Sequence, residues 1–213
     1  MADGKRLLLI GGGGHCASVI DSVLRAGEYE KVGIVDGNAS VSIMGVSVAG
    51  SDGDLPELLK DGWTHAFISV GSIGDVKLRR KLYSMVKELG FAVPSIIDPS
   101  AVIAGNADIA EGVFIGKNAV VNTGAVIGTC AIINTSSVVE HDCSVGEFCH
   151  VSPGAVLLGN VKVGNNTHIG AGSVVRQGTK IDEDVLVGQG SNVVSDIESG
   201  VTAFGNPCRV VIR

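Results

Sequence analysis

Every sixth residue of the C-terminal half of the chain is aliphatic, and this period is the strongest constraint on the fold. The series runs for 17 positions without an insertion. Its members are Ile97, Ile103, Ile109, Ile115, Val121, Ile127, Ile133, Val139, Val145, Val151, Leu157, Val163, Ile169, Val175, Ile181, Val187 and Val193. The residue two positions before each of them is never larger than valine. Gly or Asn often follows the aliphatic residue, as at Gly116 and Asn122, and both types tolerate left-handed turn geometry.

A period of six with these features indicates a parallel β-helix built from hexapeptide repeats. Three hexapeptides complete one triangular coil of about 18 residues, so the series forms between five and six coils. The aliphatic side chains would fill the interior, and successive coils would pair as parallel strands about 4.8 Å apart. Cys143 and Cys149 occupy the small-residue positions, so we expect them to be inert core residues.

Residues 1–94 follow a different pattern, in which short apolar runs alternate with helical periodicity. Strands are predicted at 6–10, 32–35 and 66–70, and helical spacing follows at 19–24 and at 75–89. This order indicates an α/β, Rossmann-like domain with a small parallel sheet, at most half of a doubly wound nucleotide-binding unit. We therefore divide the chain into a Rossmann-like domain, 1–94, and an all-β parallel β-helix, 95–213.

Composition excludes several classes of protein. Glycine supplies 31 of 213 residues, but with only 5 prolines and 45% hydrophobic residues the chain is neither collagen-like nor disordered. The net charge of −6 offers no basic field for nucleic acid or an anionic membrane. The longest apolar run near the N-terminus, 7–10, is too short for a signal peptide or a membrane span. Five irregularly spaced cysteines without a CxxC pair argue against a disulfide framework, so we expect a soluble cytoplasmic protein.

Four segments carry a more specific signal. They are the Gly-rich turn 11–15, which ends in His15, the run 134–143, and the segments 146–152 and 205–209. Together with the two-part organisation they resemble the PglD/NeuD family of bacterial hexapeptide-repeat sugar acetyltransferases along nearly the whole chain. The resemblance implies a left-handed coil, acetyl-CoA as cosubstrate, and a homotrimer with active sites between subunits. It also implies transfer of acetyl to the 4-amino group of a nucleotide-linked 4-amino-4,6-dideoxy sugar.

His141 is the predicted general base. A neutral imidazole can take the proton from a sugar amine as the amine attacks the acetyl thioester, and the resemblance places the base at this position. Asp142 and Glu140 adjoin it, and either carboxylate could orient the ring. The family uses the acid that follows the base, often a Glu, so we expect Asp142 in this role with Glu140 as the alternative.

The resemblance also implies coenzyme contacts at His150, Ala171, Gly188 and Gln189. His150 lies half a coil after His141, so the two cannot stack in one column. His168 comes 18 residues after His150, directly one coil above it, and we expect a structural or solvated role for it.

In the N-terminal domain the resemblance places the sugar-nucleotide site at Gly13, Gly14, His15, Asp36 and Gly71. Backbone amides at a glycine turn and helix start can hold a diphosphate. Asp36 ends the second predicted strand, where such folds bind a ribose or base. Ser72 follows Gly71 where the family commonly carries Asn, a change that bears on which base or sugar is accepted.

Other functions fit parts of the sequence. One is O-acetylation of sialic acid or a similar sugar. Another is a metal-dependent hydratase with zinc held between subunits by His141, His150 and His168, although their spacing is not that of close ligands and we predict no metal site. An NAD-dependent enzyme is disfavoured because only three strands are predicted in the first half, and a non-catalytic scaffold leaves the cluster 140–142 unexplained. Acetyl-CoA and a nucleotide-linked amino sugar are the expected partners, with no nucleic acid and no membrane insertion.

Overall fold

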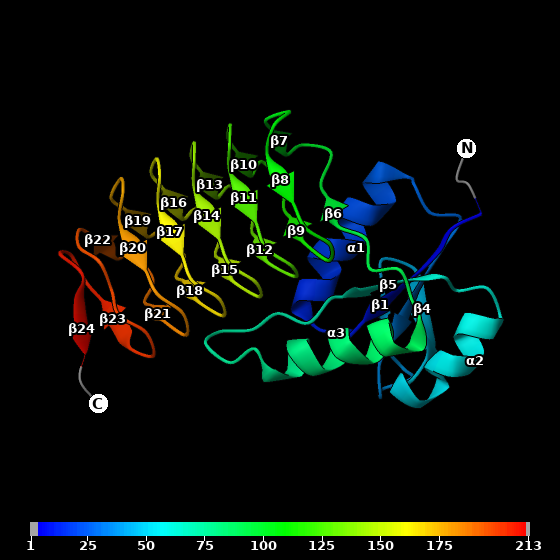
Figure 1. The fold of residues 1–213 in the computed structure, drawn as a ribbon. Coiled ribbons are helices and arrows are strands. Elements are labelled where there is room, and N and C mark those ends of the chain that lie inside the picture. Colours follow the sequence, from blue (N-terminus) through cyan, green and yellow to red (C-terminus); the bar gives the residue numbers. More distant parts are fainter. Residues whose placement is uncertain (1–3, 212–213) are drawn as a thin grey trace.

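The computed structural model describes residues 4–211, which form a Rossmann-like unit followed by a β-helix (Figure 1). The first unit contains β1 (Arg6–Ile10), α1 (Gly14–Ala26), β2 (Lys31–Val35), β3 (Ser42–Ile43), β4 (Val46–Gly50), a 3-10 turn (Asp52–Asp54), α2 (Leu55–Lys60), β5 (His65–Ile68) and α3 (Lys77–Leu89). Its strands are arranged in the order β3-β4-β2-β1-β5. The α/β class is confirmed.

The sheet is larger than the three parallel strands predicted from the sequence. β3 and β4 form a hairpin, β4 pairs with β2 in parallel, and β3 is antiparallel to β4. The hairpin turn is Met44-Gly45, and both residues have positive φ, 51° and 81°. Such turns are usually recognised in a sequence by Asn-Gly or Asp-Gly, so methionine at the first position conceals this one.

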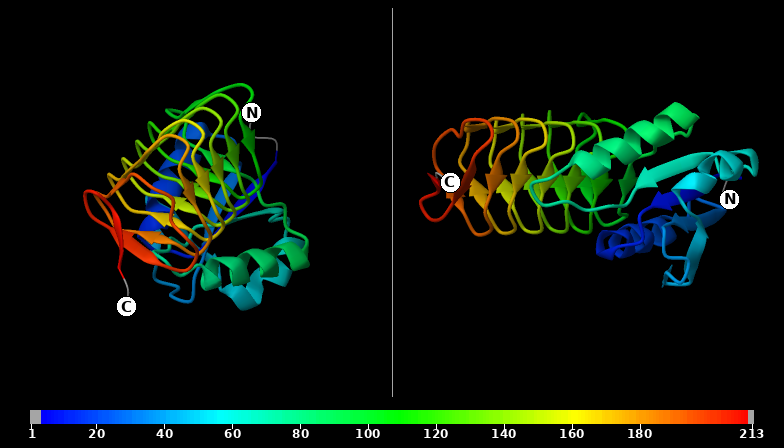
Figure 2. Two further views of the ribbon diagram at one scale, coloured as in Figure 1. Left: turned by 60° about the vertical axis from the view of Figure 1, so that its left-hand side comes forward. Right: turned by 90° about the horizontal axis from the view of Figure 1, so that it is seen from below.

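The second unit is a left-handed parallel β-helix, as predicted. Each of the 17 hexapeptides forms a two-residue strand. The strands are β6 (Ile96–Ile97), β7 (Val102–Ile103), β8 (Asp108–Ile109), β9 (Phe114–Ile115), β10 (Val120–Val121), β11 (Val126–Ile127), β12 (Ile132–Ile133), β13 (Val138–Val139), β14 (Ser144–Val145), β15 (His150–Val151), β16 (Val156–Leu157), β17 (Lys162–Val163), β18 (His168–Ile169), β19 (Val174–Val175), β20 (Lys180–Ile181), β21 (Leu186–Val187) and β22 (Asn192–Val193). They stack into the three walls of a prism, seen from two sides in Figure 2. β23 (Thr202–Phe204) and β24 (Arg209–Val211) are antiparallel to each other and extend the wall that contains β21 at its C-terminal end.

The interior of the prism is filled by the periodic aliphatic residues. From Ile115 to Val193 each of them is buried, whereas Ile97 in the first coil is 38% exposed because no earlier coil covers it. Cys143 and Cys149 are buried in this core, and burial raises the pKa of the Cys149 thiol to about 12. Neither thiol is therefore an available nucleophile near neutral pH.

The three walls of the prism differ in what their outward side chains meet. The first wall carries Ile96, Phe114 and Ile132, which pack against the apolar face of α1. The second carries Asp108, Val126, Ser144, Lys162 and Lys180, and is largely polar. The third, which we call the valine wall, carries Val102, Val120, Val138, Val156 and Val174 in one column. Val102 and Val174 are 63% and 39% exposed, so nothing within residues 4–211 covers this end-to-end apolar column completely.

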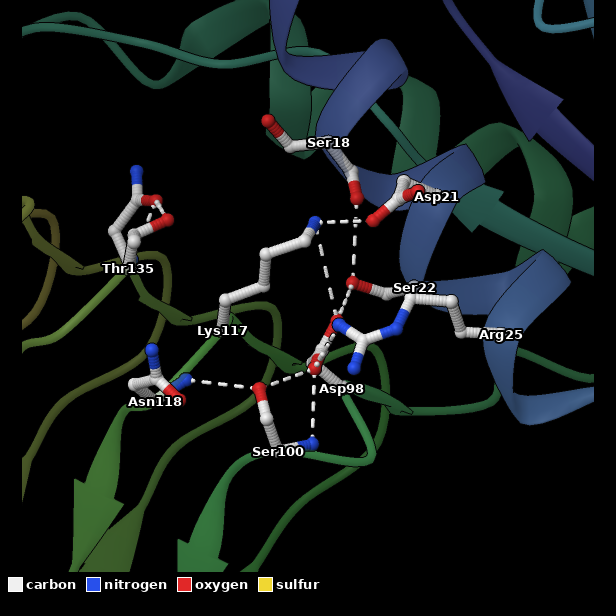
Figure 3. Close-up of polar contacts among 10 residues, drawn as sticks. Ser18, Asp21, Ser22, Arg25, Asp98, Ser100, Lys117, Asn118 and Thr135 are labelled. Carbon is white, nitrogen blue, oxygen red and sulfur yellow. Dashed lines mark hydrogen bonds and ion pairs between the residues drawn. The ribbon is translucent and has the colours of Figure 1, made fainter.

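A buried carboxylate joins α1 to the first coil (Figure 3). The Asp98 side chain accepts hydrogen bonds from the Ser22 and Ser100 hydroxyls at 2.7 and 2.6 Å. The Arg25 guanidinium donates to it at 3.1 Å, and Lys117 Nζ lies 2.6 Å from Asp21 on the same helix. The hydrogen bonds from Ser100 and Ser22 keep the pKa of Asp98 below its usual value, although burial alone would raise it.

Replacing Asp98 by alanine is expected to destabilise the protein by roughly 3 kcal/mol, because the buried Ser22 hydroxyl, the Ser100 hydroxyl and Arg25 lose a charged hydrogen-bond partner. For a chain of this size that corresponds to a fall in Tm of roughly 6–12 °C, measured by differential scanning calorimetry. Asp61→Ala, at an exposed carboxylate outside this network, is the control. An unchanged Tm for Asp98→Ala would show that the network does not hold the two units together.

Candidate active site

His141 lies on the turn between β13 and β14, with its ring held by the next residue. Nδ1 lies 2.9 Å from Asp142 Oδ2, and the side chains are 46% and 66% exposed. Asp142 has φ 59°, a left-handed conformation that Asp and Asn adopt more readily than most residues. Asp142 thus reaches the ring although its side chain is shorter than the Glu often found at this position. Within residues 4–211, His141 Nε2 makes no hydrogen bond.

Glu140 is directed elsewhere. Its carboxylate accepts hydrogen bonds from Asn122 Nδ2 at 2.9 Å and from the backbone N–H of His141 at 3.1 Å. It therefore supports the turn, whereas Asp142 contacts the imidazole. Of the two carboxylates left open by the sequence, the geometry favours Asp142 as the ring's partner.

Two adjoining cavities lie where the loop after β5 meets the first wall of the prism. One, of about 670 Å³, is lined by His15, Ser18, Gly71, Ser72, Ile73, Asn134, Thr135, His150 and Pro153. The other, of about 350 Å³, is lined by Ile73, His150, Ser152, Pro153, His168, Gly170, Ala171, Leu186, Val187, Gly188 and Gln189. The first draws on both units of the chain, and Ile73, His150 and Pro153 line both cavities. All four residues assigned to the coenzyme from the sequence meet in the second cavity.

His150 is fixed at the junction by a hydrogen-bond chain. The Thr135 N–H donates to Asn134 Oδ1 at 2.8 Å, so Asn134 Nδ2 faces His150 Nε2 as a donor at 3.0 Å. The other ring nitrogen, Nδ1, then donates to the Ser72 carbonyl at 3.0 Å. Burial lowers the pKa of His150 to about 3, so the ring is neutral near pH 7. Asn134 begins the run 134–143, and only the fold shows that it lies beside His150.

His168 stacks on His150, as the 18-residue spacing predicted. Their rings meet edge to face at 4.9 Å, in register on β15 and β18. His168 Nε2 lies 3.2 Å from the Ser152 hydroxyl, and burial lowers its pKa. Within residues 4–211 no group of three or more His, Cys, Asp or Glu side chains is placed to hold a metal ion.

His15 and Gly71 lie together in the larger cavity. His15 is packed edge to face against Phe114, and burial together with the Arg79 charge lowers its pKa to about 4. Its Nε2 is buried without a hydrogen-bond partner in the described residues. A methyl group on Gly71 would lie 3.3 Å from His15 Cβ, so a glycine there lets the loop approach the histidine closely.

Gly13, Gly14 and Asp36 are not among the residues that line either cavity. Gly13 precedes the first turn of α1 and Gly14 begins the helix. The Asp36 carboxylate accepts hydrogen bonds from the backbone N–H groups of Asn38 at 2.9 Å and Gly12 at 2.8 Å, and these bonds lower its pKa. In this chain Asp36 holds the glycine turn in shape.

Arg79 of α3 keeps the loop and the prism together. The side chain is almost fully buried, and it donates to the carbonyl oxygens of Cys130 and Phe148. It also lies 3.5 Å from the Ser72 hydroxyl, beside the larger cavity. No sequence pattern predicts this contact, because the partners lie 51 and 69 residues away and are contacted through their backbone.

Comparison with known proteins identifies the family. Residues 6–86 match the family described as PglD N-terminal domain, and residues 142–177 match the bacterial transferase hexapeptide repeats. A perosamine N-acetyltransferase variant from Caulobacter crescentus, solved with CoA and GDP-perosamine, is 37% identical, with 100% of this chain and 99% of that chain covered and a TM-score of 0.93. The acetyltransferase domain of PglB from Neisseria gonorrhoeae, solved with acetyl coenzyme A, is 33% identical over 98% and 100% of the two chains, with a TM-score of 0.92.

WeeI from Acinetobacter baumannii, at 24% identity over 97% and 100% of the two chains and a TM-score of 0.81, shares the fold. The similarity to the first two proteins extends over both units of the chain and far exceeds a shared hexapeptide pattern. The family resemblance of the sequence motifs is thereby confirmed, and the chain belongs to the PglD-like hexapeptide-repeat sugar acetyltransferases.

Proposed function

We propose that this protein transfers acetyl from acetyl-CoA to the 4-amino group of a nucleotide-linked 4-amino-4,6-dideoxy sugar. The family makes the chain an acetyl-CoA-dependent acetyltransferase. The assignment of a nucleotide-linked amino sugar as the acceptor rests on one observation. Two adjoining cavities share a boundary at His150, Ile73 and Pro153. Similar enzymes have been solved with CoA and GDP-perosamine together, which supports an amino-sugar acceptor over a sialic acid hydroxyl.

The two cavities suggest how the substrates are arranged. The pantetheine arm of acetyl-CoA would lie along Ala171, Gly188 and Gln189 and bring its thioester toward His150. The sugar would occupy the larger cavity, beside His15 and Gly71. The nucleotide would extend toward the start of α1, where the amides at Gly13 and Gly14 can bind a diphosphate, with Asp36 holding the turn. Residues 1–94 would thus hold the acceptor and residues 95–213 the donor.

The chemistry we propose is direct attack in a ternary complex. Asp142 orients His141 through Nδ1, and Nε2 takes a proton from the amine as its nitrogen bonds to the thioester carbonyl carbon. A backbone N–H stabilises the resulting oxyanion. The C–S bond then breaks, the departing thiolate takes the proton from His141 Nε2, and CoA leaves as the thiol while the amide is complete.

One chain does not bring His141 to the cavities. His141 lies at the edge of the valine wall that adjoins β14, and Asn134, Pro153 and Ala171 lie on turns at the opposite edge. A three-fold assembly in which valine walls face neighbouring copies would cover this apolar surface and bring His141 of one subunit beside the cavities of the next. We therefore propose a homotrimer with sites between subunits.

In the described residues no helix is long and apolar enough to cross a membrane. Acetyl-CoA and nucleotide sugars are cytoplasmic metabolites, and the five cysteines are free, so we propose that the enzyme acts in the cytoplasm.

The experiment that tests the reaction is a thiol-release assay with acetyl-CoA. The acceptors are GDP-perosamine, the UDP- and dTDP-linked 4-amino-sugars, and free sialic acid. Turnover with one nucleotide amino-sugar is expected, with the amide product identified by mass spectrometry. Turnover on sialic acid alone, or on none of the acceptors, would contradict the proposal.

A further inference from the structure

The turns at the edge of the valine wall that carries His141 are built on one template. The second residue after each strand of the valine wall recurs every 18 residues along one column. The residues in this column are Gly105, Thr123, His141, Gly159 and Gln177. In four of these five turns the residue that follows is left-handed, as at Asp142 and Asn160, and the first turn, at Gly105, is the exception; Gly159 itself does not have a positive φ. Three of the five residues in the column carry side chains longer than a methyl group. The turn therefore does not require glycine at position 159.

The lack of room beside the His141 ring explains why residue 159 is a glycine. A Cβ atom built on Gly159 would lie 2.6 Å from Cε1 of His141, 3.1 Å from its Cδ2, and closest of all to Nε2. Real Cβ atoms essentially never come that close to another heavy atom. The imidazole of His141 thus lies directly over the backbone of Gly159, one coil further along the prism.

The backbone on both sides of this contact is fixed. The Asn160 N–H donates to the His141 carbonyl at 2.8 Å, and the Gly178 N–H donates to the Gly159 carbonyl at 2.9 Å. An added methyl group would therefore displace the imidazole, which rotates about side-chain torsions, before it displaced the coil. Rotation would take Nδ1 away from Asp142 Oδ2, now 2.9 Å away.

We infer that Gly159 is a positioning residue for His141: by lacking a side chain, it lets the imidazole lie over the next coil with Nδ1 on Asp142 and Nε2 free. This inference rests on the proposed role of His141 as the base. It adds a second determinant of the ring's position, acting by shape where Asp142 acts by hydrogen bonding.

The test is Gly159→Ala, with Gly105→Ala as the matched control. Gly105 belongs to the same column, and a Cβ there would meet no atom within 4 Å. Gly159→Ala is expected to lower kcat by about 10–100-fold, since a misplacement of about 1 Å in a reacting group can cost that much. The KM values for both substrates, the Tm and the oligomeric state should stay close to wild type, and Gly105→Ala should be unchanged throughout.

Two further measurements separate positioning from a general structural effect. In the His141→Ala background, Gly159→Ala should cause no additional loss of kcat, because the residue it acts through is absent. Nitrogen-15 NMR of the His141 ring should show the Nδ1–H tautomer in the wild type and an altered balance of tautomers in Gly159→Ala.

The results that would overturn the role of Gly159 differ from those that would contradict the proposed function. An unchanged kcat with an unchanged His141 spectrum would overturn the inference. So would a raised KM for acetyl-CoA with kcat preserved, since Gly159 would then make room for the coenzyme. A wild-type protein without acetyl transfer would contradict the proposed function, and the NMR comparison would still decide whether Gly159 sets the position of the ring.

Discussion

His141→Ala is expected to lower kcat by about 10²–10⁴-fold, the usual contribution of a general base. The side chain is half exposed on a turn and contributes nothing to the prism core, so the protein should keep its Tm and its oligomeric state. Steady-state kinetics by thiol release, together with gel filtration and calorimetry, measure both aspects. Activity within about threefold of wild type would remove His141 from the mechanism, and loss of the assembly would make its role structural.

Substitutions at the two neighbouring carboxylates, Asp142 and Glu140, should lower kcat to different extents in the same assay. Asp142→Asn keeps the shape of the side chain but removes the charge that favours an Nδ1–H imidazole, so kcat should fall well below wild type. Glu140→Gln should have the smaller effect, because Glu140 contacts Asn122 and the turn backbone. The reverse order would make Glu140 the orienting acid.

Val138→Asp is expected to dissociate the assembly and abolish activity in the same variant. Val138 lies in the middle of the valine wall, on the same coil as His141, and a carboxylate there would be buried without a partner between copies. Analytical ultracentrifugation gives the mass in solution, and thiol release gives the activity. The control is Ser144→Asp, on the polar wall of that coil, which should remain assembled and active. An active, monomeric Val138→Asp would contradict a site shared between subunits.

Complementation tests the shared site without disrupting the assembly. His141→Ala subunits retain the cavities, and His150→Ala subunits retain the proposed base. When equal amounts are dissociated and reassembled together, about a quarter of the interfaces would combine an intact His141 with an intact neighbouring cavity. The mixture should therefore recover up to about a quarter of wild-type kcat. A mixture as inactive as its components would place the whole site in one chain.

The sequence was most informative where structure repeats. The aliphatic period predicted every strand from β6 to β22, and the pair at 141 and 142 lies as expected. It was least informative where contacts join distant segments. Ser72 and His150, which are hydrogen-bonded, are 78 residues apart. Arg79 contacts the prism through backbone carbonyls, and any residue type carries a backbone carbonyl, so the sequence does not indicate these partners. The Met44-Gly45 hairpin was missed because its turn lacks the usual Asn or Asp.

Asp36 shows a contact that its place in the sequence does not reveal. Its position at the end of a strand predicts a ligand contact, and its carboxylate also accepts hydrogen bonds from the backbone amides of Gly12 and Asn38. The residue type alone does not show that this side chain also shapes the glycine turn beside it.

The antiparallel pair β23–β24 affects how the last coil of the prism can pair with another chain. A stack of parallel coils presents unpaired backbone groups at its last rung, and another chain could add to that rung in the manner of a growing fibril. Here the chain reverses direction, so that β24 pairs antiparallel with β23 and places Arg209 on the terminal strand. A reversed strand with a charged residue is a poor template for a further parallel coil. On the one wall of the prism that it extends, the pair β23–β24 therefore disfavours the addition of a further parallel coil.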